Sequence, residues 1–204
     1  MDRFLIKRSS TESCDLVDTK RHKQHDKHDE ESGRDHHVND VESRIVDYIL
    51  ARANWGVRNS ISSKSSCRKV LVIGKPYYWL NESIEMDKAP ECFKEFAAKH
   101  NVDDCNSILC NVYESKESRI AKHCDNTSLL EPGKGDVVSI SLAIHHSDRS
   151  KELAKMYFSD KTTLSLKHGT VVRFDAFVDA LANRTHCIPS TYAPRISLTF
   201  RHLK

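Results

Sequence analysis

The segment from residue 195 to residue 201, Arg-Ile-Ser-Leu-Thr-Phe-Arg, alternates strictly between polar and apolar residues. Successive side chains of a β-strand leave opposite faces of a sheet, so this period of two predicts a strand with one apolar and one polar face. The apolar residues would pack into a core, while both arginines point the other way. A solvated sheet face has the same pattern, so the strand alone indicates a half-buried sheet and no function.

His123 and Asp125 are two residues apart. On one strand their side chains would leave the same face and could bind one metal ion from adjacent directions. His186, on a later predicted strand, can supply a third ligand. Two imidazoles and a carboxylate form the facial triad of non-haem Fe(II) oxygenases, which leaves positions open for a co-substrate and O2. Singly, each residue is more often a structural histidine or a turn aspartate, but together they favour a metal site.

A second alternating segment, residues 108 to 113, places Asn111 and Tyr113 on one face shortly before the His-Asp pair. The sequence thus predicts polar-faced strands around one cavity. A dicarboxylate bound there would need an arginine, because the planar guanidinium pairs bidentately with a carboxylate and keeps its charge when buried. Asn111 and Tyr113 could add further hydrogen-bond donors.

These residues occur in a fixed order: Asn111-x-Tyr113, His123-x-Asp125, His186, then Arg195-Ile-Ser-Leu-Thr-Phe-Arg201. In this order, over about residues 107 to 201, the chain resembles the AlkB family of 2-oxoglutarate- and Fe(II)-dependent dioxygenases, compact copies of which also occur in plant RNA virus polyproteins. The family pattern is N-x-Y, H-x-D, a distal His and R-x-N-x-T-F-R. Ser197 departs from it, since most members have Asn there and a hydroxyl has less reach than an amide.

The resemblance implies a double-stranded β-helix, or jelly roll, that binds Fe(II) through His123, Asp125 and His186. It also implies 2-oxoglutarate and O2 as co-substrates and N-methylated bases in single-stranded RNA or DNA as substrate, with RNA favoured. The products would be the repaired base, formaldehyde, succinate and CO2. The residues expected at 2-oxoglutarate are Asn111, Tyr113, Arg195, Ser197 and Arg201. Arg195 would pair with the distal carboxylate, and Arg201, six residues further along the same face, would lie near the iron end and hold Asp125 or the C1 carboxylate.

The substrate is open to other interpretations. The same barrel could hydroxylate a protein or a small molecule, or it could be an RNA-binding accessory protein whose site has decayed. Tyr77, Tyr78 and Trp79 form the aromatic cluster that could hold a base taken out of its stack, although short aromatic runs more often pack in a core. The net charge of +3 permits nucleic-acid binding without requiring it.

The pattern along the chain predicts an α+β fold with a charged, His-rich, disordered tail at residues 1–40 and one dioxygenase domain at 41–204. Helices are expected at about 41–53, capped by Asn39 or Asp40, and at 90–100. Residues 54–66 should form a loop and 69–73 a short strand. Further strands are expected at about 107–113, 119–125, 137–144, 155–158, 163–167, 170–174, 184–188 and 195–201.

The sequence contains no membrane span and no signal peptide, which predicts a cytosolic or nuclear protein, and we expect a monomer. Seven cysteines without a C-x2-C pair are expected to be reduced thiols and not a zinc site. Cys124 should point away from the metal ligands, into the core. The tail histidines His22, His25 and His28 could bind a soft metal, but a solvated tail is the simpler interpretation.

Overall fold

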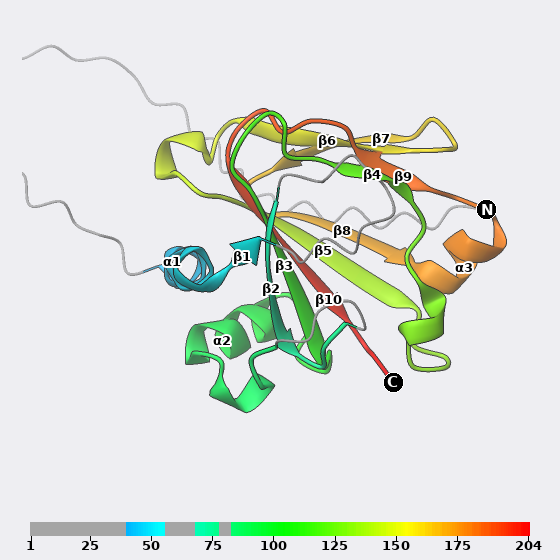
Figure 1. Ribbon diagram of the computed structural model, residues 1–204, viewed down its shortest axis with the longest axis horizontal. Helices are drawn as coiled ribbons and strands as arrows, with labels where there is room; N and C mark the ends of the chain where they lie inside the picture. The colour runs from blue at the N-terminus through cyan, green and yellow to red at the C-terminus, as the bar shows by residue number, and fades with distance from the viewer. Residues whose placement is uncertain (1–39, 56–67, 78–82) are drawn as a thin grey trace, which may run out of the picture.

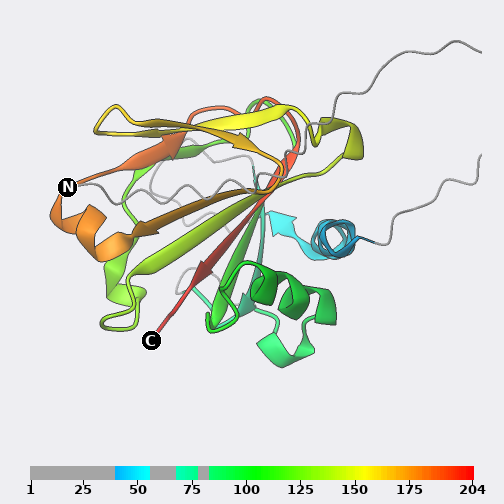
Figure 2. The same ribbon diagram turned by 180° about the vertical axis from the view of Figure 1, so that it is seen from behind.

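The structure is a computed structural model that describes residues 40–55, 68–77 and 83–204. Its strands form a six-stranded sheet, ordered β1-β2-β3-β10-β5-β8, and a four-stranded sheet, ordered β4-β9-β6-β7. The smaller sheet lies over one face of the larger, with α1 and α2 on the opposite face (Figures 1 and 2). This is the predicted double-stranded β-helix with flanking helices. The predicted tail, apart from residue 40, lies outside the described residues.

The elements have the following bounds: α1 Val41–Arg52, β1 Asn54–Trp55, β2 Lys69–Gly74, η1 Met86–Lys88, α2 Glu91–Lys99, β3 Ser107–Tyr113, β4 Ile120–His123, η2 Thr127–Leu129, β5 Asp136–Ala143, η3 His146–Asp148, β6 Glu152–Phe158, β7 Thr163–Lys167, β8 Thr170–Asp175, α3 Ala176–Leu181, β9 His186–Ile188 and β10 Arg195–Arg201. Among the described residues, no helix has the length and apolar character that a membrane crossing needs.

The two flanking helices form where the sequence predicts them. Asp40 caps α1, because its side chain accepts a hydrogen bond from the backbone N–H of Glu42 at 3.2 Å. Ile45 and Ile49 lie one turn apart and are fully buried against the large sheet. In α2, which follows Pro90, the buried aromatic side chains also face this core. Both helices therefore cover the outer face of the large sheet.

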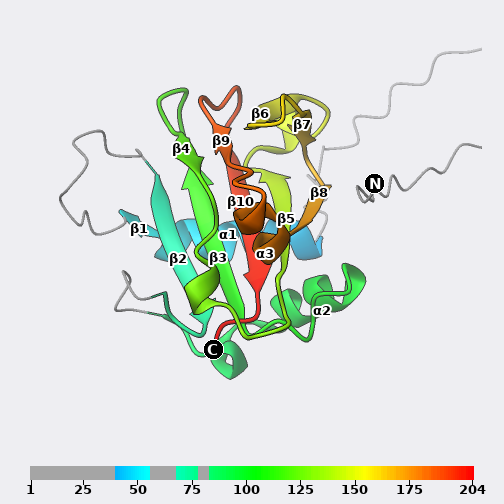
Figure 3. The same cartoon turned by 90° about the vertical axis from the view of Figure 1, so that its right-hand side faces the viewer.

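Strand β10 lies in the middle of the large sheet, paired with β3 and β5. Its apolar residues pack with α1 and α2 in the outer core, as the alternation predicts. Its polar residues consequently face the smaller sheet. In register, Arg195 lies opposite Tyr113 and Ser197 lies opposite Asn111, so the two alternating segments point their polar side chains into the same interior. Figure 3 shows the same layers from a second direction.

Several predicted boundaries are wrong. Strand β4 ends at His123, so Asp125 lies beyond it, where its carboxylate bonds Arg201. Strand β9 begins only at His186, and helix α3 lies between β8 and β9 at 176–181, where Asp175 caps it by accepting from two backbone N–H groups. Helix α3 was not predicted from the sequence. Asn54–Trp55 forms the short strand β1 instead of loop, β6 begins at residue 152, and residues 56–67 lie outside the described part.

Glu42 links α1 by hydrogen bonds to α2 and to the turn after β7. Its carboxylate accepts a hydrogen bond from Nε2 of His168 at 2.7 Å and from Nζ of Lys99 at 3.2 Å. His168, in the turn after β7, accepts the backbone N–H of Ala143 at its other ring nitrogen at 3.1 Å. The bond from His168 is the main reason that the pKa of Glu42 falls to about 2, although burial opposes it.

This contact predicts an acid-dependent contribution to stability. Because the pKa of Glu42 is lowered on folding from 4.5 to about 2, the ionised carboxylate stabilises the fold above pH 4.5 and loses this effect as the pH falls toward 2. We expect Glu42→Gln to lower the free energy of unfolding by roughly 2 kcal/mol at neutral pH. Urea denaturation at pH 7 and pH 3 checks this, and the difference from wild type should shrink at the lower pH. Glu95→Gln, in an exposed pair with Arg44, is the matched control.

Candidate metal and dicarboxylate site

Three side chains meet between the two sheets. His123, at the end of β4, lies opposite His186 of β9 in the strand register, and their ring centroids are 4.4 Å apart. Asp125 follows two residues later, with its Oδ1 3.8 Å from Nε2 of His123. One ligand atom from each of the three residues lies within 4.8 Å of the other two. The structure thus brings the predicted triad together.

The hydrogen bonds of His123 leave one ring nitrogen for a metal. Its Nδ1 lies 2.9 Å from the carbonyl oxygen of Ala121. A carbonyl can only accept, so Nδ1 must carry the proton and donate. In the neutral imidazole with this tautomer, Nε2 carries the lone pair and faces Asp125. A backbone carbonyl that holds the second nitrogen of a metal-binding imidazole is a common arrangement.

Asp125 is held as an anion. Its side chain is 8% exposed, and its Oδ2 accepts a hydrogen bond from Nη2 of Arg201 at 2.9 Å. Burial opposes ionisation, but the charge and hydrogen bond of Arg201 outweigh it, so the pKa of Asp125 lies below its ordinary value. The contact expected between Arg201 and Asp125 is present. Oδ1 of Asp125 stays turned toward His123.

His186 is buried between the sheets beside Phe158 and Phe174. Burial, followed by the neighbouring His123, lowers the pKa of His186 to about 4, so its imidazole is neutral at physiological pH. Within the described part of the chain its Nδ1 has no hydrogen-bond partner. A neutral buried imidazole with an unsatisfied nitrogen, a second imidazole with a free lone pair and an ionised carboxylate fit a divalent cation.

Tyr77 lies in the core and contacts Arg201, the partner of Asp125. Its hydroxyl oxygen accepts a hydrogen bond from Nη1 of Arg201, and the guanidinium lies 5.5 Å from the ring centroid. Only 8% of Tyr77 is exposed, and burial raises its pKa to about 12. This position does not support the predicted role as a wall for a flipped base, because the ring packs in the core and its hydroxyl is engaged. Tyr78 and Trp79 lie outside the described residues.

This placement predicts the effect of Tyr77→Phe. The phenylalanine keeps the ring but leaves a buried N–H of Arg201 without its acceptor, which costs about 1–3 kcal/mol of stability. We expect the melting temperature to fall and Fe(II) to bind more weakly, because Arg201 orients Asp125. A base-stacking wall, in contrast, would tolerate phenylalanine. Calorimetry and Fe(II) titration together check this, and an unchanged melting temperature would contradict the assignment.

Arg195 lies at the start of β10 and is completely buried. Its Nη1 donates to Oγ of Ser141 at 3.3 Å, and its guanidinium lies 4.1 Å from the centroid of the Tyr113 ring. Its Nε and Nη2 have no hydrogen-bond partner among the described residues. Burial lowers its pKa, Tyr113 opposes this effect, and the nearby cation Arg68 makes a smaller contribution in the direction of burial. A buried guanidinium with two unsatisfied nitrogens and a second cation close by favours an anionic ligand.

The other predicted residues line the same interior face. Asn111 is buried, and its Oδ1 has no partner in the part of the chain that the structure describes. Ser197, opposite Asn111 in the register, shares a hydrogen bond with Ser139 at 3.0 Å between their hydroxyl oxygens. Its hydroxyl is therefore already engaged with β5. The predicted anion-binding residues thus lie along β3 and β10, and the Arg201 contact with Asp125 lies at the far end of β10.

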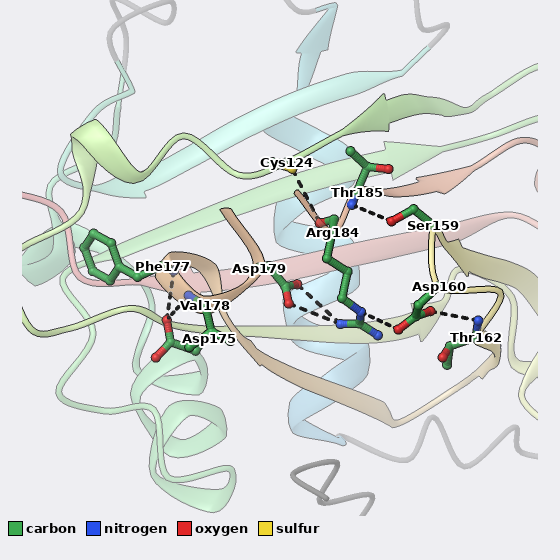
Figure 4. Close-up of polar contacts among 10 residues, drawn as sticks. All are labelled: Cys124, Ser159, Asp160, Thr162, Asp175, Phe177, Val178, Asp179, Arg184 and Thr185. Atoms are coloured by element: carbon green, nitrogen blue, oxygen red, sulfur yellow. Dashed lines mark hydrogen bonds and ion pairs between the residues drawn. The ribbon is translucent and has the colours of Figure 1, made fainter. Parts of the chain in front are cut away.

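Arg184, which was not predicted as a site residue, holds the segment before His186 (Figure 4). Its side chain pairs with Asp160 at 2.7 Å and with Asp179 of α3 at 3.3 Å, and it lies over the Phe158 ring. Its backbone carbonyl accepts the thiol of Cys124 at 3.4 Å between sulfur and oxygen. Cys124 is therefore half-buried and bonded across to this segment, and its predicted place in the core is wrong. This network links the two chain segments that carry the triad.

The fold is similar to solved structures. One is a prolyl hydroxylase from Trichoplax adhaerens in complex with a peptide fragment of the hypoxia inducible factor oxygen degradation domain, with a TM-score of 0.51 and 11% identity over 80% of this chain and 78% of that chain. Another is a prolyl-4-hydroxylase from Pseudomonas putida, with a TM-score of 0.48 and 15% identity over 79% and 84% of the two chains. No protein-family model and no curated protein matches the sequence. At this identity, the first likeness shows a shared fold.

Proposed function

We propose that this chain is an Fe(II)- and 2-oxoglutarate-dependent dioxygenase. The observation that carries the proposal is the meeting of His123, Asp125 and His186, whose ligand atoms lie within 4.8 Å of one another. A facial set of two imidazoles and one carboxylate is the donor arrangement of non-haem Fe(II) oxygenases. The shared fold with a solved prolyl hydroxylase supports this choice over other metal chemistry on a β-barrel.

The three ligands have distinct roles. The imidazoles of His123 and His186 would bind Fe(II) as neutral donors, and Asp125 would supply the negative charge. Arg201 donates a hydrogen bond to Oδ2 of Asp125 and so leaves Oδ1, which is turned toward His123, for the metal. When bound, Fe(II) supplies O2 activation, with 2-oxoglutarate as the electron source that is oxidised to succinate and CO2. Phe158 and Phe174 pack around His186 and keep bulk water from this side.

Arg195 would bind the distal carboxylate of 2-oxoglutarate through its unsatisfied Nε and Nη2. The Ser141 hydroxyl and the Tyr113 ring fix the plane of the guanidinium from two sides. Asn111, which has an unsatisfied buried oxygen, and Ser197 lie next along the same face. Arg201 lies at the metal end, where the C1 carboxylate would be bound.

For the substrate, we propose N-methylated bases in single-stranded nucleic acid, with RNA favoured over DNA, oxidised at the methyl group and released as formaldehyde. The support is the order of motifs from Asn111 to Arg201, which resembles the AlkB pattern. Hydroxylation of a protein is the second candidate, because the structural neighbour from Trichoplax adhaerens is described in complex with a peptide. An accessory role with a decayed site is tested by the same assay, whereas a cytoplasmic or nuclear monomer remains a separate prediction.

The test is succinate formation from 2-oxoglutarate by the full-length protein with Fe(II) and ascorbate. Methylated single-stranded RNA, the same RNA without methyl groups, methylated DNA and a proline-containing peptide are compared. We expect stimulation by methylated RNA, with formaldehyde formed in a one-to-one ratio with the stimulated succinate. Stimulation by the peptide alone would favour the protein hydroxylase. No succinate under any condition, with Fe(II) bound, would contradict the enzymatic proposal.

A further inference from the structure

A second group of metal-ligating side chains lies away from the triad. Asp104 and Cys105 are in the turn between α2 and β3, and His202 follows the last residue of β10. One ligand atom from each of the three lies within 4.8 Å of the other two. Since Arg201 pairs with Ser107 in the strand register, the turn and the C-terminal segment lie at the same end of the large sheet, beside the C-terminus (Figure 1).

Hydrogen bonds fix this arrangement from both sides. The side chain of Asn106 clamps Leu203, because its Nδ2 donates to the carbonyl at 2.9 Å and its Oδ1 accepts the N–H at 2.8 Å. The backbone N–H of Asn106 donates to the carbonyl of Arg201 at 3.2 Å, and that of Glu131 donates to the carbonyl of His202 at 2.9 Å. The three ligands are therefore held by ordered backbone and lose little conformational freedom on binding a metal.

One distance within the group is close to that expected around a tetrahedral ion. Nε2 of His202 lies 3.2 Å from Oδ2 of Asp104. Two ligands at about 2.0–2.2 Å from one tetrahedral centre are about 3.3–3.6 Å apart, so the pair needs only a small adjustment. The imidazole of His202 is buried, whereas the carboxylate of Asp104 is 74% exposed in its side chain and Cys105 is half-buried. An ion can therefore enter from solvent and take water as a fourth ligand.

We propose that Asp104, Cys105 and His202 form a second metal site that takes a divalent cation of the zinc type. A thiolate, an imidazole and a carboxylate are ligands that Zn²⁺ accepts together, whereas the triad has no sulfur. The ion would join the α2–β3 turn to the end of β10, one residue after Arg201. The site does not depend on the function of the triad. The sequence does not reveal it, because His202 is distant along the chain from Asp104 and Cys105.

Cobalt(II) is the probe that separates the two sites. Bound to a thiolate it gives a strong charge-transfer absorption in the near ultraviolet, which an ion held by two histidines and an aspartate lacks. We expect this band when Co²⁺ is added to the metal-free full-length protein, and we expect it to persist in His123→Ala, which removes a triad ligand. It should disappear in Cys105→Ser and persist in Cys187→Ser, the control at another half-buried thiol.

Zinc binding gives the second readout. In the His123→Ala background, Zn²⁺ should raise the melting temperature, and Asp104→Asn should weaken this binding by at least about tenfold, since even outer-shell partners are worth about 10–100-fold. Asp104 is exposed, so this variant tests the site even if Cys105→Ser is unstable. The proposal is overturned if wild type gives no thiolate band, if the band survives in Cys105→Ser, or if Asp104→Asn binds Zn²⁺ as tightly as its parent.

Discussion

Replacing His123 by alanine is expected to abolish Fe(II)-dependent turnover while the fold survives. A facial site has no spare protein ligand, and loss of a direct ligand should reduce turnover by at least about 100-fold. The side chain of His123 is 33% exposed, and it contacts the carbonyl of Ala121 and the other two ligands. Its removal therefore leaves little buried polar surface unsatisfied. Fe(II) binding by calorimetry, succinate formation and the melting temperature of the metal-free protein are the measurements.

Asp125→Asn and His186→Ala test the other two ligands, but both substitutions should also lower the stability of the fold. Asp125 pairs with the buried Arg201, so even the isosteric amide should lower the melting temperature, and alanine should lower it further. His186→Ala leaves a cavity beside two aromatic rings. His146→Ala, at an exposed histidine in η3, is the matched control and should leave iron binding and stability unchanged. Normal iron binding by His123→Ala would remove that residue from the triad.

The fold was predictable where side-chain periodicity is strong. Strand β10 alternates without a break, and its apolar residues pack in the core with α1 and α2. Where an element is short or its end depends on a distant contact, periodicity fails. Strand β4 stops at His123 because the carboxylate of Asp125 turns toward Arg201. Helix α3 has only six residues, and Asp175 as its cap was the local signal that could have revealed it.

The candidate site likewise contains residues that the sequence predicts and residues whose positions depend on the fold. Residue types and spacing predicted the triad residues and Arg195 as candidates, because few side-chain types can bind a metal or a carboxylate. The structure brings the ligand atoms of the triad within 4.8 Å of one another, and the binding roles stay predictions. The positions of Arg68, Tyr77 and Arg184 follow from the fold alone. Tyr77 and Arg184 bond residues distant in sequence, and the charge of Arg68 acts on the distant Arg195. Tyr77 shows the limit most clearly. In the sequence it belongs to an aromatic run, whereas in the structure its hydroxyl serves Arg201.

Arg195 offers a prediction that separates a ligand-binding arginine from a structural one. It is completely buried, and it forms no ion pair with a carboxylate among the described residues. A buried cation without a counter-ion destabilises the fold unless a ligand supplies one. Arg195→Met, which keeps the length and removes the charge, is therefore expected to leave the melting temperature of the ligand-free protein unchanged or to raise it. If the arginine were structural, the same substitution would lower it.

The same variant should fail to bind 2-oxoglutarate. Each hydrogen bond to a charged group contributes about 1.5–3 kcal/mol, so loss of the bidentate pair should raise the KM for 2-oxoglutarate by about 100-fold or more. Arg195→Lys keeps the positive charge but cannot form the bidentate pair, so it should recover only part of the affinity for 2-oxoglutarate. Adding 2-oxoglutarate at 100 times its Kd should stabilise wild type by about 2.7 kcal/mol and Arg195→Met hardly at all. An unchanged KM in Arg195→Met would place the dicarboxylate elsewhere. If Arg195→Met has a lower melting temperature without ligand but is stabilised by 2-oxoglutarate as much as wild type, Arg195 is a structural residue.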